Sequence, residues 1–398
     1  MPSSPSDHNI RHVMTFHEPP IDRRGTSSEK WERYAGRDIL PLWVADMDLP
    51  TAPFVLDAVR ERLEHPILGY TAPPARMVEA FVAWLHERYG WRVAEDWLVW
   101  IPGVVTGFNV AARAATGNGC ELIVPAPVYG PILDVPANVG LRGVVSPLVL
   151  NRGRWEMDVD DLASKVSPDT AAVLFCNPQN PTGRVYDRDE LEALAELVLR
   201  NRTLVISDEI HCPIVLDPTK RHVPIASLDR AVEARSISLF APTKAFNFPG
   251  LNAAVAVIPD PDLREAYESV GTGLISTHSP LAFAALTAAF ADDTDWLLEQ
   301  NAFLAGNARR LETAVAGIDG IRTTRVEGTY LAWLDVSALG LADAPTAFEH
   351  RGLGLHAGEE FGDPRFLRFN FGCPRSILDQ ALDRLVQAAG ELATPKPG

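Results

Sequence analysis

The 398-residue sequence contains no run of 18 or more apolar residues, only four cysteines and only five lysines. Without a long apolar run, no membrane-spanning helix is expected. Residues 1–16 are polar and lack the apolar segment of a signal peptide, so export is not expected. The cysteines show no C-x-x-C spacing, and with the ten histidines they form no metal-ligand pattern. We therefore expect a cytoplasmic protein with reduced thiols and no metal centre.

Positive charge is also scarce. Asp and Glu total 52 against 36 Lys and Arg, which gives a formal net charge of −16 at pH 7. Such a chain is a poor candidate for binding nucleic acid or an anionic membrane surface. Because most of the basic residues are arginines, a lysine in an apolar setting stands out.

Several signature motifs of common enzyme classes are missing. The sequence has no H-E-x-x-H, no G-x-S-x-G and no G-x-x-x-x-G-K-[ST]. Gly352-x-Gly354 lacks the third glycine of a dinucleotide-binding loop and lies late in the chain. These absences argue against a zinc peptidase, an α/β-hydrolase, a P-loop enzyme and a nicotinamide-dependent dehydrogenase.

What is present is a series of short apolar runs that alternate with helical patterns. The runs are rich in Val, Ile, Leu and Ala without polar alternation, which is typical of strands buried on both faces. They cover residues 121–124, 171–176, 204–207, 236–240 and 253–258. Helical periodicity appears before and between them, for example in residues 55–63, 77–85 and 189–200. The order predicts an α/β fold with a mostly parallel central sheet.

The pattern changes after about residue 280. Two helical stretches, 281–290 and 296–315, precede strand-like residues 329–336 and 368–371 and a last helix from residue 376. We expect residues 51–284 to form the large domain and residues 285–398 a smaller C-terminal α+β domain. Residues 1–50 are expected to supply a flexible arm of about 20 residues and part of the small domain.

Three polar residues follow the predicted strands. Because ligands in open α/β sheets lie beyond the carboxyl ends of the strands, Asn180, Asp208 and Lys244 are expected to meet at one crevice. A buried Lys244 has a lowered pKa and a neutral amine that can attack a carbonyl, although a lysine reaching solvent fits its local context equally well. Asp208 needs a positive partner if buried, such as a protonated ring nitrogen, but an ordinary role as a helix N-cap or as the partner of an arginine is also open. His211 contacts a ligand or is an ordinary packed histidine.

Two further segments have weaker signals. Residues 102–107 begin a helix with small residues, so the backbone N–H groups of this segment can bind a phosphate. Glycine before a helix is common, however, and the pattern is not specific. Tyr129 follows another strand, where its ring either stacks on a planar ligand or packs in the core.

The order and spacing of these features are more specific than any one of them. The glycine-rich helix start, the aromatic residue, Asn-Pro-Thr-Gly, Asp208, a lysine 36 residues later and a late arginine resemble fold-type I pyridoxal-phosphate (PLP) enzymes of the aminotransferase class I/II superfamily. Within it the chain most resembles the MalY/PatB-type cystathionine β-lyases, or C–S lyases. The segments that carry this resemblance are residues 22–31, 40–48, 207–211, 328–335 and 368–376. The likeness runs from about residue 22 to residue 376.

The resemblance implies a cofactor, pyridoxal 5′-phosphate, held in the large domain. Lys244 would form the Schiff base with it and later move protons, and Asp208 would pair with the pyridinium nitrogen. Asn180 and His211 would lie near the 3-oxygen of the ring, and Tyr129 would stack on the ring.

The resemblance also implies phosphate and substrate contacts. The backbone at Val104 and Val105, with Thr243, would hold the phosphate. Tyr70 would reach the phosphate of a neighbouring subunit, which implies a homodimer with shared active sites. Arg368 would bind the substrate carboxylate through two parallel hydrogen bonds, and Ala45 would also contact the substrate.

The chain departs from the superfamily pattern at four places. Asn252 stands where aminotransferases usually have a phosphate-binding arginine, and Ala241 where a serine is frequent. Residues 358–366 form a shorter loop than usual, and residues 276–280 differ from the subgroup. The last two segments are expected to border the substrate side chain.

The function that the resemblance implies is β-elimination from cystathionine or another cysteine S-conjugate, giving a thiol, pyruvate and ammonia. An aminotransferase is the alternative, because it uses the same residues up to loss of the Cα proton. A regulatory protein that acts by protein contact is a third reading. No basic patch or helix-turn-helix extension precedes residue 22 to support it.

Overall fold

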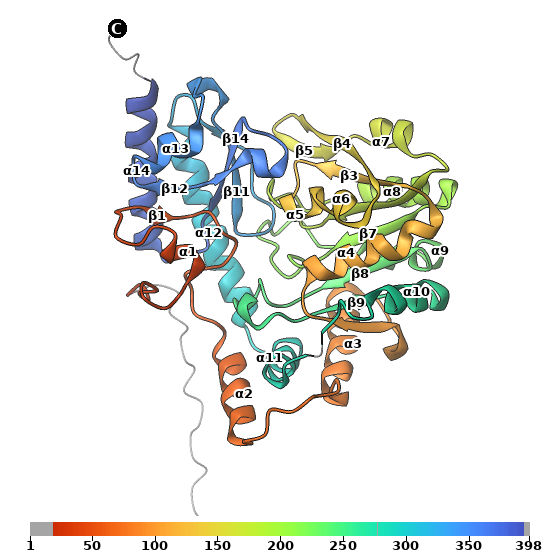
Figure 1. Cartoon of the computed structure of the whole chain (residues 1–398). Coiled ribbons are helices and arrows are strands. Elements are labelled where there is room, and N and C mark those ends of the chain that lie inside the picture. The colour runs from red at the N-terminus through yellow and green to blue at the C-terminus, as the bar shows by residue number, and fades with distance from the viewer. Residues whose placement is uncertain (1–18, 277, 394–398) are drawn as a thin grey trace, which may run out of the picture.

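The computed structural model describes residues 19–276 and 278–393. The predicted flexible arm therefore lies almost entirely outside the described residues, as does Thr277. The remaining chain forms a large sheet with helices on both faces and a smaller sheet beside one end of it (Figure 1). Among the described residues, no helix has both the length and the apolar character needed to cross a membrane.

The large sheet has eight strands. In spatial order they are β2 (Leu98–Ile101), β9 (Ala254–Val257), β8 (Ser236–Phe240), β7 (Leu204–Asp208), β6 (Thr170–Cys176), β3 (Glu121–Ala126), β4 (Arg142–Asn151) and β5 (Arg154–Met157). Strands β3, β4, β6, β7 and β8 are parallel to one another, whereas β9 and β5 are antiparallel to their neighbours. The predicted α/β fold with a mostly parallel sheet is confirmed.

Burial on both faces explains the unbroken apolar runs. In β3, Leu122 and Val124 belong to the core under α4 (Val104–Ala115) and α10 (Pro261–Gly271). Ile123 points the other way, into the core under α8 (Arg188–Asn201). Because successive side chains of a strand point to opposite faces, a strand between two helical layers needs apolar residues at every position.

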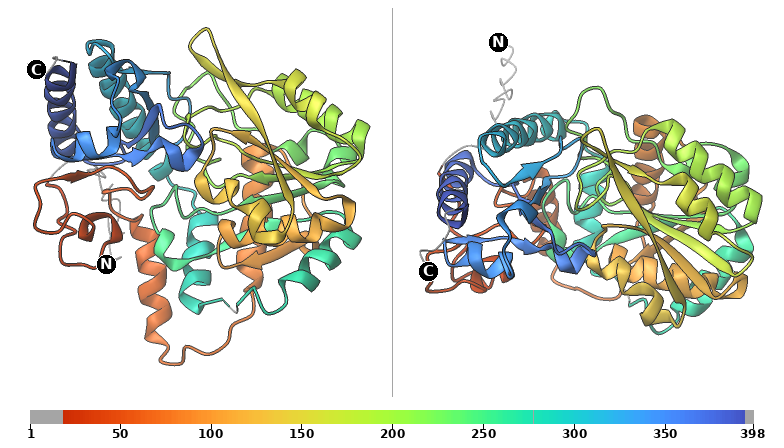
Figure 2. Two further views of the ribbon diagram at one scale, coloured as in Figure 1. Left: turned by 45° about the horizontal axis from the view of Figure 1, so that its top comes forward. Right: turned by 90° about the horizontal axis from the view of Figure 1, so that it is seen from above.

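The smaller sheet has four antiparallel strands in the order β10 (Arg322–Thr323), β11 (Leu331–Asp335), β14 (Phe366–Asn370) and β13 (His356–Ala357). Near the chain start, β1 (Leu40–Pro41) pairs in parallel with β12 (Leu353–Gly354). Helices α12 (Trp296–Ala316) and α14 (Arg375–Ala393) pack against each other beside this sheet (Figure 2). The domain boundaries near residues 50 and 284 stay a prediction.

Several helices connect the two sheets or cap the edges. They are α1 (Glu29–Glu32), α2 (Pro53–Glu64), α3 (Ala75–Tyr89), α5 (Gly130–Leu133), α6 (Val135–Val139), α7 (Val159–Lys165), α9 (Arg230–Glu233), α11 (Pro280–Phe290) and α13 (Ala344–Glu349). Short 3₁₀ helices are η1 (Glu95–Trp97), η2 (Thr116–Asn118), η3 (Ile225–Ser227), η4 (Pro249–Leu251), η5 (Ser337–Leu339) and η6 (Gly358–Phe361). The helices that periodicity predicted correspond to α2, α3, α8, α11, α12 and α14.

Candidate active site

A cavity of about 880 Å³ lies where the carboxyl ends of the parallel strands face the smaller sheet. The predicted site residues that line it are Ala45, Val104, Val105, Tyr129, Asn180, Asp208, His211, Thr243, Lys244 and Arg368. Ten of the predicted site residues therefore come together although they are spread over more than 300 positions of the chain. Tyr70 is the exception: it does not line the cavity, and 94% of its surface is exposed.

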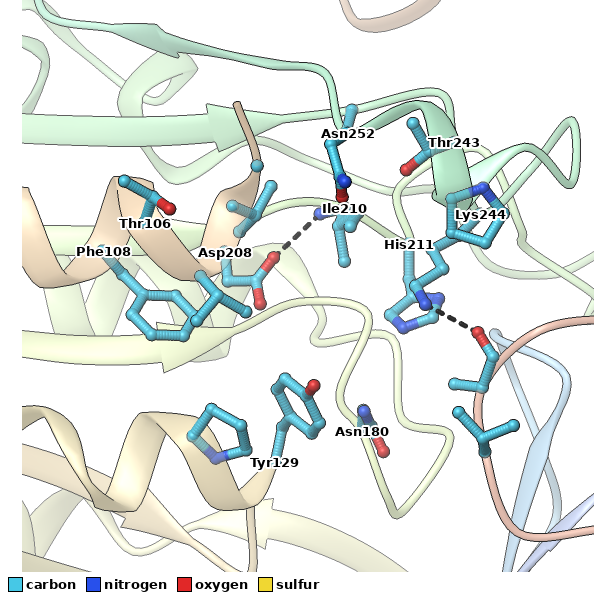
Figure 3. A pocket seen from close by; sticks show the side chains of 18 of the residues that line it. Thr106, Phe108, Tyr129, Asn180, Asp208, Ile210, His211, Thr243, Lys244 and Asn252 are labelled. Atoms are coloured by element: carbon cyan, nitrogen blue, oxygen red, sulfur yellow. Dashed lines mark hydrogen bonds between the residues drawn. The ribbon is translucent and has the colours of Figure 1, made fainter. Parts of the chain in front are cut away.

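Lys244 enters the cavity from the loop that follows β8 (Figure 3). Its Nζ donates a 2.6 Å hydrogen bond to the backbone oxygen of Ala45. Burial, reinforced by the positive charge of Arg368, lowers the pKa of Lys244 to about 8. About a tenth of the amine is therefore neutral and nucleophilic at pH 7, far more than in an exposed lysine.

Asp208 is the last residue of β7 and is buried, with 3% of its surface exposed. It accepts a hydrogen bond from the backbone N–H of Ile210 at 3.1 Å, which is drawn in Figure 3. Burial nevertheless raises the pKa of Asp208 to about 7. A carboxylate in this environment is stabilised by a protonated ring nitrogen placed against it.

His211 and Asn180 also line the cavity. Burial, with the charges of Lys244 and Arg368, lowers the pKa of His211 to about 3, so its ring is neutral. Asn180 is in the loop after β6, and its Oδ1 accepts a 2.9 Å hydrogen bond from Arg368 Nη1. Neither side chain carries charge, so both suit hydrogen bonding to a polar ligand atom rather than pairing with an ion.

The start of α4 offers backbone donors to the cavity. The helix begins at Val104. Because its N-cap residue is Gly103, which has no side chain, no capping side chain accepts hydrogen bonds from the N–H groups of the first turn. Unpaired N–H groups at a helix N-terminus form a site for a phosphate. Thr243, Asn252 and Ala241 line the same cavity. Asn252 and Ala241, the two departures expected near the phosphate, therefore do lie at this site.

Arg368 carries the site's buried positive charge. It lies in the middle of β14 with 1% of its surface exposed, and burial lowers its pKa to about 10, which leaves it protonated at neutral pH. Its hydrogen bonds go to Asn180, to the Trp43 backbone oxygen and to His356. Among the described residues no carboxylate forms an ion pair with Arg368. A buried guanidinium arranged in this way suits a carboxylate from a ligand.

Some cavity residues were not singled out from the sequence. Trp43 and His356 line the cavity and contact Arg368, and Tyr330, which is outside the lining, donates to the Ala45 oxygen at 2.9 Å. Residues 276, 278 and 279 and residues 360–361 also line the cavity, which confirms that the two unusual segments border it. Histidine and glutamate in residues 356–360 were the signal available in the sequence, but the contact of His356 with Arg368 depends on strand pairing.

The fold and this cavity define a PLP-type α/β enzyme, and comparison with known proteins agrees. The chain belongs to the aminotransferase class I and II family, whose model matches residues 37–385. The curated protein "Cystathionine beta-lyase PatB" of Bacillus subtilis is 34% identical over 379 residues, which are 92% of this chain and 98% of that protein. The predicted resemblance is confirmed.

Solved structures show the same relationship. The crystal structure of OvoB has a TM-score of 0.90 and 41% identity, covering 93% of this chain and 97% of that chain. Cystalysin from Treponema denticola has a TM-score of 0.89 and 27% identity, covering 96% and 100%, and contains pyridoxal 5′-phosphate. The fold-type I architecture and the predicted cofactor are confirmed.

Proposed function

We propose that this protein is a PLP-dependent C–S lyase that releases a thiol from cystathionine or another cysteine S-conjugate. The main support for this proposal is that three buried residues meet in one cavity: Lys244 with its lowered pKa, Asp208, and Arg368. Within the described residues, Arg368 forms no ion pair with a carboxylate. The similarity to a cystathionine β-lyase along 92% of the chain supports elimination rather than amino-group transfer. Asn252 stands in place of the phosphate-binding arginine that is usual in aminotransferases, which also supports a function other than standard amino-group transfer.

The cavity residues fit pyridoxal 5′-phosphate. Asp208 would hold the proton on the pyridine nitrogen, and the first turn of α4 with Thr243 would bind the phosphate. Tyr129 would contact the ring, and Asn180 and His211 would donate or accept hydrogen bonds near its 3-oxygen. When bound, the cofactor supplies an electron sink that makes the Cα proton of an amino acid removable.

The chain's own groups then direct the reaction. Arg368 binds the substrate carboxylate and so orients the Cα–H bond. The Lys244 amine would take the Cα proton. The Cβ–S bond breaks and the thiolate leaves with its electron pair. Addition of water to the remaining three-carbon unit gives pyruvate and ammonia.

A product assay distinguishes elimination from amino-group transfer. With L-cystathionine and no keto-acid acceptor, we expect free thiol and pyruvate to form in equal amounts over many turnovers. The readouts are a thiol reagent and pyruvate reduction by lactate dehydrogenase. An S-alkyl cysteine series run in parallel defines which leaving group is preferred. Turnover that requires added keto acid, with no pyruvate from the substrate, would instead establish an aminotransferase.

We also propose a homodimer with shared active sites. Tyr70 is 94% exposed and follows exposed apolar residues at positions 63, 67 and 68, a cluster that suits burial against a second subunit. Sedimentation velocity is expected to give twice the chain mass of 43.5 kDa. Ile67→Asp should shift the species toward the monomer and weaken PLP retention, whereas Val386→Asp, at another exposed apolar site, should not. A wild-type monomer at micromolar concentration would contradict the proposal.

We further propose a cytoplasmic location. The four cysteines, including the exposed Cys120, are free thiols, and unpaired thiols suit a reducing compartment.

A further inference from the structure

The hydrogen bonds of Arg368 leave it without a ready pair of donors. A guanidinium has five N–H groups in a fixed plane. Nη1 donates to Asn180 Oδ1 at 2.9 Å, while Nη2 donates to the Trp43 oxygen at 2.6 Å and to His356 Nδ1 at 2.9 Å. Within the described part of the chain Nε has no hydrogen-bond partner. Both N–H groups of Nη2 are therefore in use.

A carboxylate that binds with both oxygens needs two adjacent, parallel N–H groups. In a guanidinium these pairs are Nε with Nη2 and Nη1 with Nη2, so either arrangement requires an N–H of Nη2. One of its two acceptors must then give way. The Trp43 oxygen makes the shorter contact and belongs to the backbone, whereas His356 makes the longer contact through a side chain. His356 is the acceptor that a carboxylate displaces.

Strand pairing and one turn hold His356 in this place. Its backbone lies directly opposite Arg368 in the antiparallel pair of β13 and β14. Glu360 lies in η6, the turn that follows β13, and its carboxylate contacts the His356 ring. The turn packs tightly, because a side chain at Gly358 would collide with the backbone oxygens of Phe366 and Asp363. Phe361 packs edge-on against the His356 ring, with centroids 4.8 Å apart.

The contacts also define the protonation of His356. Arginine only donates, so Nδ1 carries a lone pair, and Nε2 carries the hydrogen that it donates to Glu360 Oε2 at 2.9 Å. Burial and the charge of Arg368 lower the pKa of His356, while Glu360 acts in the opposite direction. The Trp43 oxygen, 3.2 Å from Nδ1, is a further acceptor available to a protonated ring. Without a ligand the ring is therefore neutral near pH 7.

We propose that His356 is a second carboxylate-binding residue, which an arriving substrate carboxylate displaces from Arg368 and which then takes a proton from solvent and donates from Nδ1 to that carboxylate. The negative charge of the ligand offsets Arg368, and the ring comes to lie between two carboxylates, those of the ligand and of Glu360. Binding of an amino acid would then be linked to proton uptake by this chain. The inference rests on the proposed role of Arg368 but not on whether the bond broken afterwards is Cβ–S.

Calorimetry on the holoenzyme tests the linkage. The probe is 3-(methylthio)propanoate, which has the carboxylate and thioether of a substrate but no amino group to react with the cofactor. Titrations near pH 7 in phosphate and in Tris, which differ in ionisation enthalpy, report the protons taken up. We expect uptake approaching about one proton per site, and a Kd that weakens by up to about tenfold per pH unit at higher pH.

Three variants assign the proton. His356→Asn has a side chain that does not titrate and should abolish the buffer dependence. Glu360→Gln keeps an acceptor for Nε2 but removes the charge, and should reduce uptake to well below half that of the wild type. Glu359→Gln removes the same charge from an exposed neighbour outside the cavity and should match the wild type. A purely structural role of His356 would change affinity without changing the proton count.

Several results would overturn the proposal. They are binding without proton uptake in the wild type, unchanged uptake in His356→Asn, and failure of the probe to bind at all. Failure of the proposed function is seen separately, in the pyruvate assay, because an aminotransferase with the same carboxylate site would still show the linked proton.

Discussion

Lys244→Ala is expected to lower turnover of any cysteine S-conjugate by at least about 10⁴-fold, with loss of the visible absorbance that a lysine-linked cofactor gives. The substitution removes both the amine that holds the cofactor and the base placed to take the Cα proton. Its pKa of about 8 makes Lys244 suited to both tasks near neutral pH. Absorbance spectra of the purified enzyme and pyruvate release measure the two effects.

Lys165→Ala is the matched control. Lys165 is partly exposed and pairs with Asp161 on α7, away from the cavity. This variant should keep both the absorbance and the activity. If Lys244→Ala retained the absorbance and a normal rate, the assignment of the covalent link and of the base would be wrong.

Arg368→Leu is expected to reduce kcat/KM by roughly 30-fold to several thousand-fold, mostly through KM. Loss of a buried, charge-assisted pair with a carboxylate costs about 2–5 kcal/mol. Because the carboxylate is bound before and during the reaction alike, removal of this contact affects binding more than the chemical step. Steady-state kinetics with an S-alkyl cysteine give KM and kcat separately.

A ligand without a carboxylate provides the control for Arg368. S-Methylcysteamine has the amine and thioether of the substrate but no carboxylate, so its affinity should be nearly the same in wild type and Arg368→Leu. Thermal unfolding of both proteins checks that the variant is folded, since Arg368 also bonds Asn180 and the Trp43 backbone. An unchanged KM for the amino acid would remove the carboxylate role.

The larger sheet was predictable because its strands are buried on both faces. An unbroken apolar run such as residues 171–176 leaves little choice of structure, and β6 spans Thr170–Cys176. Strands β4 and β5 were missed because Ser146 and Pro147 interrupt the apolar residues of β4, and polar residues alternate with apolar ones in the short edge strand β5. The antiparallel direction of β9 was missed as well, since an apolar run carries no sign of its direction.

The site divides in the same way. Asp208 and Lys244 could be singled out because each follows a buried strand, and the carboxyl ends of parallel strands meet at one edge. His356 and Trp43 could not, because His356 reaches Arg368 only through the pairing of β13 with β14, and Trp43 reaches it through a contact between segments far apart in the chain. No local pattern marks a backbone oxygen as the partner of an arginine more than 300 residues away.

The fold class, the family and the residues able to carry the chemistry follow from the amino-acid sequence. They depend on residue type, local spacing and the order of motifs along the chain. The ionisation of those residues and the partners of Arg368 follow from folding instead. Burial and strand register set both, since the pKa of Lys244 and the acceptors of Arg368 depend on groups brought close by folding.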